Sequence, residues 1–190
     1  MSLLIAGLLI FSAIHFVPSF PGVKESMKTR LGVMGYRGIF SGISLVALLL
    51  MIYGYAESQP GSLDVWTLPS WGRDVTPALM LIAFVLLAAT YLRGNIARIA
   101  RHPMTLSVIV WAGAHLLANP TQADVVLFGG ILAWAIVAIL FAFARDKDLK
   151  FSTGAAAMRN DVLAIAVGVV VYILFVWRIH EWLIGVQPVP

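Results

Sequence analysis

The sequence predicts an all-α fold, a polytopic membrane protein built as a six-transmembrane-helix bundle in a single domain over residues 1–190. Three observations predict it. Hydrophobic residues make up 61% of the chain, charged residues only 12%, and the mean hydropathy is +0.93. Soluble domains are about half apolar, and about 20 consecutive apolar residues suffice to cross a bilayer as a helix. The charges fall between long apolar runs, as expected of loops between spans.

Six apolar runs have suitable lengths for spans. They cover residues 3–20, 39–55, 75–92, 104–119, 123–144 and 162–184. The first run has no basic segment before it, so we expect a retained helix rather than a signal peptide. Pro77 and Pro103 stand near the expected starts of the third and fourth spans, where proline is tolerated. Asp124 falls in the first turn of the fifth, where the helix dipole favours an anion.

The basic residues predict the orientation. All but two of the 13 Lys and Arg residues fall in three loops expected on one side of the membrane. These are Lys24, Lys28, Arg30, Arg37, Arg93, Arg98, Arg101, Arg145, Lys147, Lys150 and Arg159. The positive-inside rule then places both termini away from the cytoplasm. Since topology accounts for the positive charge, no nucleic-acid partner is predicted.

Absences exclude several classes. There is no cysteine, which excludes disulfides and thiolate chemistry. No acidic or basic residue falls at the middle of an expected span, which argues against a proton-coupled transporter. Phosphate-loop, HExxH zinc and serine-nucleophile motifs are also missing. The catalytic residues, if the protein is an enzyme, are unknown from the sequence.

Two histidines fall inside expected spans, His15 and His115. An imidazole at membrane depth is costly unless it has a partner or a function. The small residues at 112–114 leave room for a flat group beside His115, and Trp111 provides a wall one turn away. Neutral imidazole is a good axial ligand for haem iron, and bundles build such sites from facing helices. The alternatives are a hydrogen-bonded core residue for His115 and a hydrated interfacial residue for His15.

Other candidates surround these two. His102 is a rival ligand, because it lies nearer the expected depth of His15, although its place before Pro103 also suits a helix start. Three arginines, Arg37, Arg98 and Arg101, are explained by the positive-inside rule. Their guanidinium groups could also bind haem propionates or an anionic substrate. His180 is expected at the membrane interface. Gly38 and Gly42 form a GxxxG pair, which predicts close helix packing.

Several motifs together resemble the NnrU family of bacterial membrane proteins. They are Ile14-His15, Tyr36-Arg-Gly-Ile-Phe-Ser-Gly-Ile-Ser-Leu45, Tyr91-Leu-Arg-Gly-Asn95, Arg101-His-Pro103 and Trp111-Ala-Gly-Ala-His-Leu-Leu-Ala-Asn119. The resemblance covers most of the chain, to about Ala144. It implies a multi-pass protein of the bacterial inner membrane with a role linked to nitrite and nitric oxide reduction.

The family is also similar to 15-cis-zeta-carotene isomerase, which holds a b-type haem between two histidines. This likeness implies haem ligation by His15 and His115, and a lipidic polyene as substrate or a respiratory or denitrification enzyme as partner. The isomerase has a cysteine three residues before its second histidine, implicated as an alternative ligand. Here that position is Ala112, so isomerase activity is a weaker implication than haem binding.

Two other functions stay open. The Arg101-His102-Pro103 element resembles isoprenylcysteine carboxyl methyltransferases, which use S-adenosylmethionine. Those enzymes follow it with a tyrosine and then an acidic residue, whereas Met104-Thr-Leu-Ser107 follows here without either. The lack of acid–base residues also fits a non-catalytic assembly factor for a respiratory enzyme.

Overall fold

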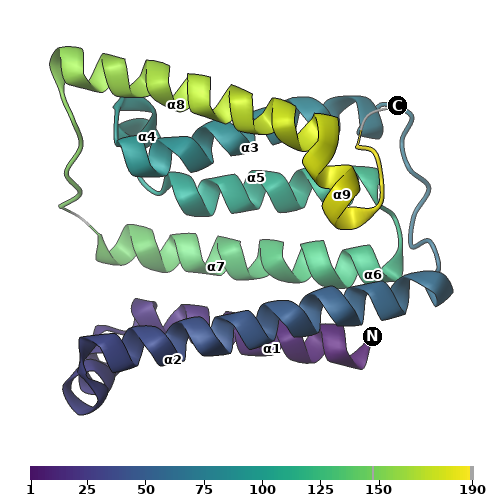
Figure 1. Ribbon diagram of the computed structural model, residues 1–190, viewed down its shortest axis with the longest axis horizontal. Coiled ribbons are helices and arrows are strands. Elements are labelled where there is room, and N and C mark those ends of the chain that lie inside the picture. The colour runs from purple at the N-terminus through teal and green to yellow at the C-terminus, as the bar shows by residue number, and fades with distance from the viewer. Residues whose placement is uncertain (147, 189–190) are drawn as a thin grey trace. The chain divides into compact units, whose positions relative to one another are not determined.

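The structure, a computed structural model, describes residues 1–146 and 148–188, so Lys147 lies outside the described residues. The all-helical prediction is confirmed over this part of the chain. The helices group into two compact units (Figure 1). The first unit is Met1–Thr67 with Asn119–Arg145, and the second is Leu68–Ala118 with the chain from Asp146 onward. The single-domain expectation stays a prediction.

Among the described residues, five helical stretches are long and apolar enough to cross a membrane. They are Ser2–Ser19, Pro21–Gly61, Gly72–Leu92, Gln122–Arg145 and Gly154–Ile184. The expected fourth span is the helix α5 (Pro103–Ala118), which is apolar but only 16 residues long. Few residues on these helices are buried, and many apolar side chains are exposed, such as Leu9 at 66% and Leu140 at 62%. Apolar surface of this extent is expected to face lipid.

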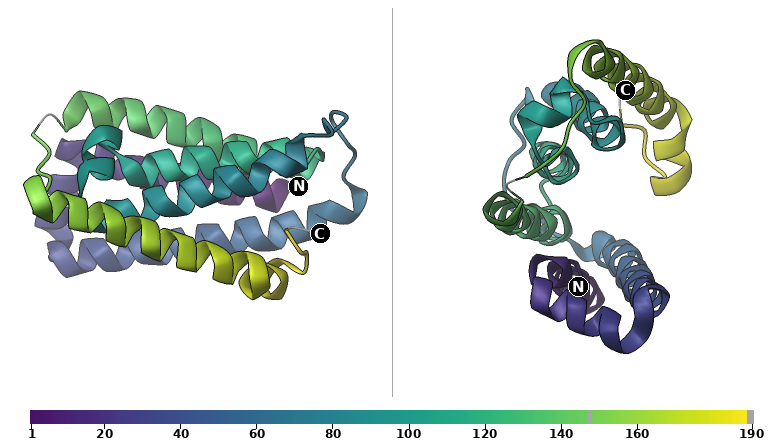
Figure 2. Two further views of the ribbon diagram at one scale, coloured as in Figure 1. Left: turned by 90° about the horizontal axis from the view of Figure 1, so that it is seen from above. Right: turned by 90° about the vertical axis from the view of Figure 1, so that its left-hand side faces the viewer.

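The first unit starts with α1 (Ser2–Phe16), the 3-10 turn η1 (Val17–Ser19) and the long helix α2 (Pro21–Ser58). It is completed by α6 (Gln122–Asp124), the π-helical turn η3 (Val125–Gly129) and α7 (Gly130–Arg145). Helix α1 packs along α2, as both views of Figure 2 show, and also contacts α7.

Helix α2 overturns the expectation of a loop between the first two spans. Residues 21–38 are helical rather than extended, so Lys24 and Lys28 lie on a helix. The helix breaks at Gly32, where φ is +72° and ψ is 165°. This backbone region is essentially restricted to glycine. The break changes the direction of the helix between residues 21–31, which carry Lys24, Lys28 and Arg30, and the long apolar part of α2, visible at the lower left of Figure 1.

The close helix contacts in this unit lie at glycines other than the predicted pair. A Cβ on Gly54 would overlap the backbone of Leu4, and one on Gly7 would lie 2.8 Å from the Met51 amide nitrogen. Gly38 and Gly42 are exposed, and a Cβ on either would meet nothing within 4 Å among the described residues. The prediction that Gly38 and Gly42 form a packing seam is therefore wrong within this chain.

The second unit contains α3 (Gly72–Leu92), α4 (Asn95–Ala100) and α5, followed by α8 (Gly154–Leu174), the π-helical turn η4 (Phe175–Ile179) and α9 (His180–Ile184). Helix α3 packs against both α5 and α8. Gly168 permits the second contact, since its Cβ would lie 2.8 Å from Val85 Cα.

Two expected boundaries in this unit are wrong. Helix α3 begins at Gly72 and contains Pro77 in its second turn, and α8 begins at Gly154, eight residues before the expected start. The side chains of Asn160 and Asp161 therefore lie on a helix, where they bind the α3–α4 corner. Asn160 donates to the Leu92 carbonyl at 2.6 Å, and Asp161 accepts from the Asn95 side chain at 2.8 Å. By contrast, Pro103 does begin α5, and the His102 carbonyl accepts from the Leu106 amide.

Candidate functional site

His15 lies near the end of α1 in the first unit, in contact with three aromatic rings. Its imidazole stacks on Phe11 with ring centroids 3.9 Å apart. The rings of Phe40 from α2 and Trp134 from α7 approach it edge-on, at 5.2 and 5.6 Å. Its Nδ1 lies 2.9 Å from the Phe11 carbonyl one turn earlier. Because that carbonyl only accepts, Nδ1 carries the proton and Nε2 is the nitrogen with a lone pair.

Trp134 adds an unusual feature beside His15. Its indole Nε1 is buried and has no hydrogen-bond acceptor among the described residues. Such an orphaned donor is rare in folded proteins. The site around His15 therefore combines an imidazole that can ligate through Nε2 with an apolar enclosure and one unsatisfied N–H group.

His115 on α5 has the same local geometry in the second unit. Its Nδ1 lies 2.9 Å from the carbonyl of Trp111, and the two rings lie 5.0 Å apart at an interplanar angle of 45°. The predicted position of Trp111 against His115 is thus confirmed. The expectation that small residues leave room here is only partly right. Ala112 and Ala114 are fully buried, and Thr76 of α3 donates to the Ala114 carbonyl. Only Gly113 faces open space.

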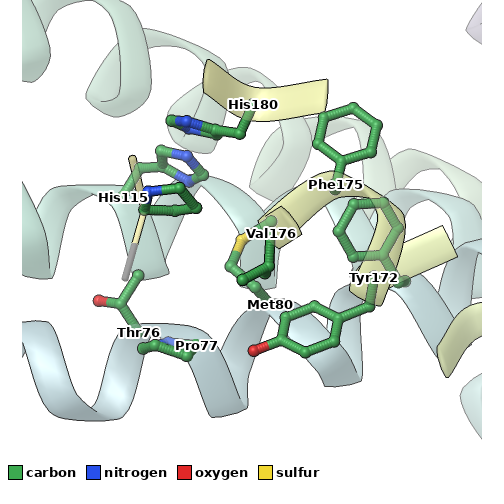
Figure 3. Close-up of a pocket in the computed structure, with 10 residues that line it drawn as sticks. Thr76, Pro77, Met80, His115, Tyr172, Phe175, Val176 and His180 are labelled. Atoms are coloured by element: carbon green, nitrogen blue, oxygen red, sulfur yellow. The ribbon is translucent and has the colours of Figure 1, made fainter. Parts of the chain in front are cut away.

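A cavity of about 60 Å³ opens beside His115 (Figure 3). It is lined by Thr76, Pro77, Met80, Phe84, His115, Tyr172, Phe175, Val176, His180 and Pro188. His180 shares this cavity with His115, although the sequence placed it at the interface. Its Nδ1 lies 2.7 Å from the Val186 carbonyl. The spacing of Tyr172, Val176 and His180, four residues apart each time, is the signal in the sequence that could have revealed this stripe.

The cavity volume tests whether a haem fits inside the second unit. A space of 60 Å³ holds about two water molecules, so it is not the pocket of a macrocycle. The two imidazoles do have the donor chemistry that haem iron requires. Histidines that bind a metal usually donate the other ring N–H to a carbonyl or carboxylate, and each Nδ1 here lies 2.9 Å from a carbonyl. Within residues 1–146 and 148–188, no group of three or more His, Cys, Asp or Glu side chains forms a metal-ion site.

The predicted arginines fall in different units. Arg37 lines a second cavity, of about 400 Å³, in the first unit. Arg98 is exposed on α4, and Arg101 follows α4 with φ of +58° and donates to the Asp146 carbonyl at 3.2 Å. Each arginine is thus exposed enough to meet an anion, and their roles toward propionates stay predictions. The sequence missed Lys24, Lys28 and Tyr36 as further lining residues of the Arg37 cavity.

Comparison with known protein families identifies the family of this chain. A family model described as NnrU protein matches residues 3–188. This extends the resemblance seen in the motifs through α8 and α9, beyond Ala144. No curated protein matches the chain. No solved structure matches it either.

Proposed function

We propose a function from the premise that this chain belongs to the NnrU family of membrane proteins. In this proposal His15 and His115 would hold the iron of one b-type haem. The observation that carries this proposal is the geometry that the two histidines share. Each imidazole engages the carbonyl four residues earlier through Nδ1, at 2.9 Å in both cases. Each therefore has Nε2 as the nitrogen for iron, in the tautomer typical of metal-bound histidine.

The surroundings of both rings support the same chemistry. His15 is enclosed by the aromatic rings of Phe11, Phe40 and Trp134, and His115 lies against Trp111. Apolar and aromatic walls tune the potential of a haem and limit access of solvent to it. Haem supplies one-electron chemistry when bound, while the protein side chains orient the ligands. Arg37, Arg98 and Arg101 are proposed partners of the propionates.

The membrane topology is part of the proposal. We place six spans in a bacterial inner membrane, with α5 as the short one and both termini away from the cytoplasm. Five helices of sufficient length and the distribution of Lys and Arg support this arrangement. The physiological role is support of nitrite and nitric oxide reduction or redox-gated isomerisation of a lipidic polyene. The partners are then membrane lipid with a lipidic substrate, or a respiratory or denitrification enzyme.

The test is the visible spectrum of the protein, purified in mild detergent after haem-supplemented expression. We expect a Soret band and, after dithionite reduction, sharp α and β bands of low-spin haem. His15→Ala and His115→Ala should each abolish the low-spin bands. His102→Ala and His180→Ala are matched controls that should preserve them. If His115→Ala retains full occupancy and an unchanged spectrum, the ligand assignment is wrong.

A featureless spectrum would remove the haem proposal and direct attention to the two other functions. Calorimetry with S-adenosylmethionine then tests the methyltransferase function, which the absence of binding at millimolar ligand would exclude. Co-purification with a respiratory enzyme tests the assembly-factor function.

A further inference from the structure

The cavity of about 400 Å³ in the first unit is a basic, half-apolar site that the haem proposal does not use as a whole. It lies where α1 ends and α2 begins. Lys24, Lys28 and Arg37 line one part of it, and Pro18, Val33 and Phe40 line another, with Tyr36 and Ser41 completing the wall. A site with three cations and an apolar side matches a ligand that has an anionic head and an apolar body.

The charges in the cavity are largely uncompensated by the protein. Lys28 pairs with Glu25 at 3.5 Å, and the Glu25 side chain is 72% exposed. Lys24 and Arg37 have no acidic partner within 4 Å among the described residues. Placing cations around a cavity without counter-charges is unfavourable in the empty protein, and an anion bound among them relieves that repulsion.

Tyr36 supplies a neutral donor in the same cavity. Its side chain is 8% exposed, and its ring lies 6.1 Å from that of Phe40. Its hydroxyl forms no hydrogen bond within the described part of the chain and is not one of the buried atoms that lack a partner there, so it is open to solvent. The hydroxyl is therefore available to an oxygen of the bound group.

The cavity is built by the backbone rather than by chance contact of side chains. The positive φ at Gly32 turns residues 21–31, which contain Lys24 and Lys28, against residues 33–41 of the same helix. Arg145 at the end of α7 donates to the Pro18 carbonyl at 3.0 Å and holds the corner between α1 and α2. The residues that line the site thus come from the turn η1 and from the two parts of α2 on either side of Gly32.

We propose that this cavity binds the headgroup of an anionic phospholipid. Its phosphate oxygens would accept from Lys24, Arg37 and the Tyr36 hydroxyl, and its glycerol and acyl parts would lie on Val33 and Phe40. In the proposed topology the cavity faces the cytoplasmic leaflet, which is rich in anionic lipid, and basic pockets between helices at that level bind such headgroups. The inference rests on the proposed orientation and does not need the two histidines to bind haem, but it assigns to the lipid phosphate the Arg37 guanidinium that the haem proposal offers to a propionate.

The experiment is native mass spectrometry of the detergent-solubilised protein titrated with dioctanoyl-phosphatidylglycerol. Lys24→Gln and Arg37→Gln should each weaken lipid binding about fivefold, and the double variant about thirtyfold. Tyr36→Phe should weaken it by roughly fivefold. Arg30→Gln is the matched control, since Arg30 is an exposed cation on the same segment that does not line the cavity, and it should leave binding unchanged.

Four results would overturn the proposal. Equal binding of dioctanoyl-phosphatidylcholine, or equal weakening by Arg30→Gln, would show non-specific adsorption. Displacement of the lipid by millimolar inorganic phosphate would assign the cavity to a free anion. Loss of haem absorbance in Lys24→Gln and Arg37→Gln with unchanged lipid binding would assign the cations to the propionates. Loss of lipid binding with the haem spectrum intact supports the lipid site, whatever the outcome for the haem ligands.

Discussion

The hydroxyl of Tyr55 donates a 2.6 Å hydrogen bond to Oδ1 of Asp124, which joins the end of α2 to the start of the helix at Gln122. Gln59 donates to the same oxygen at 3.2 Å, and Thr121 bonds the other oxygen through its amide and hydroxyl groups. Asp124 is 3% exposed. A buried carboxylate is tolerated when several donors surround it, so this residue is a structural anchor as well as a helix-start residue.

The first prediction follows from this anchor. Tyr55→Phe removes one donor to a charged, buried acceptor and should lower the free energy of unfolding by about 1.5–3 kcal/mol. Tyr53→Phe is the control, because Tyr53 is 65% exposed and should change stability by less than about 0.5 kcal/mol. Reversible unfolding in mixed detergent micelles measures both. Equal effects of the two substitutions would contradict the structural role of Asp124.

The second prediction concerns the cap that α8 provides for α4. Asp161 Oδ1 accepts the Ile96 amide at 2.9 Å, as an N-terminal capping group would, although it lies 65 residues away. Asp161→Ala should cost about 1–2 kcal/mol and speed hydrogen exchange at the Ile96 amide. Asp148→Ala, at an exposed carboxylate, is the control. Unchanged protection of Ile96 in Asp161→Ala would show that the cap contributes nothing.

The third prediction separates packed glycines from exposed ones. Gly54→Ala places a methyl group on the Leu4 backbone, and the resulting overpacking should destabilise the protein by about 1–3 kcal/mol. Gly42→Ala meets open space and should be neutral or stabilise by up to about 1 kcal/mol. Thermal unfolding at low protein concentration distinguishes them. Comparable loss of stability in Gly42→Ala would restore the predicted seam at Gly38 and Gly42.

The fourth prediction tests the break in α2. Gly32→Ala forces a Cβ into a backbone region that L-residues avoid, so it should cost about 1–3 kcal/mol. Gly22→Ala, in the first turn of the same helix with open space around it, should not destabilise the protein. The same unfolding assay measures both variants. Full stability of Gly32→Ala would mean that the turn of residues 21–31 is not held in place.

Local sequence patterns were sufficient to predict much of the secondary structure of this protein. The apolar runs predicted the helices, because a helix can cross a membrane when its segment is long and apolar enough. Both properties belong to a continuous stretch of sequence. The i to i+4 relation between Trp111 and His115 was predictable for the same reason. The start of α8 was not, because the polar residues Asn160 and Asp161 look like a loop until α3 and α4 supply their partners.

In the candidate site, too, some residues could be predicted from the local sequence and others only from the tertiary structure. His15 and His115 stood out in the sequence because an imidazole is rare in an apolar run. His180 did not, since it lies among polar residues near the chain end, and only the packing of α8 on α3 brings it to the cavity of His115. Lys24 and Lys28 likewise looked like topology signals, and the break at Gly32 decided that they line a cavity with Arg37.

The amino-acid sequence alone was enough to predict that the chain is helical, apolar enough for a membrane and a member of the family suggested by its motifs, because these properties depend on composition and short spacings. Tertiary structure decided which glycines pack, where Asp124 and Asp161 find their donors and which cations share a cavity. These contacts join residues up to 127 positions apart, as between Arg145 and Pro18, and no local pattern encodes them.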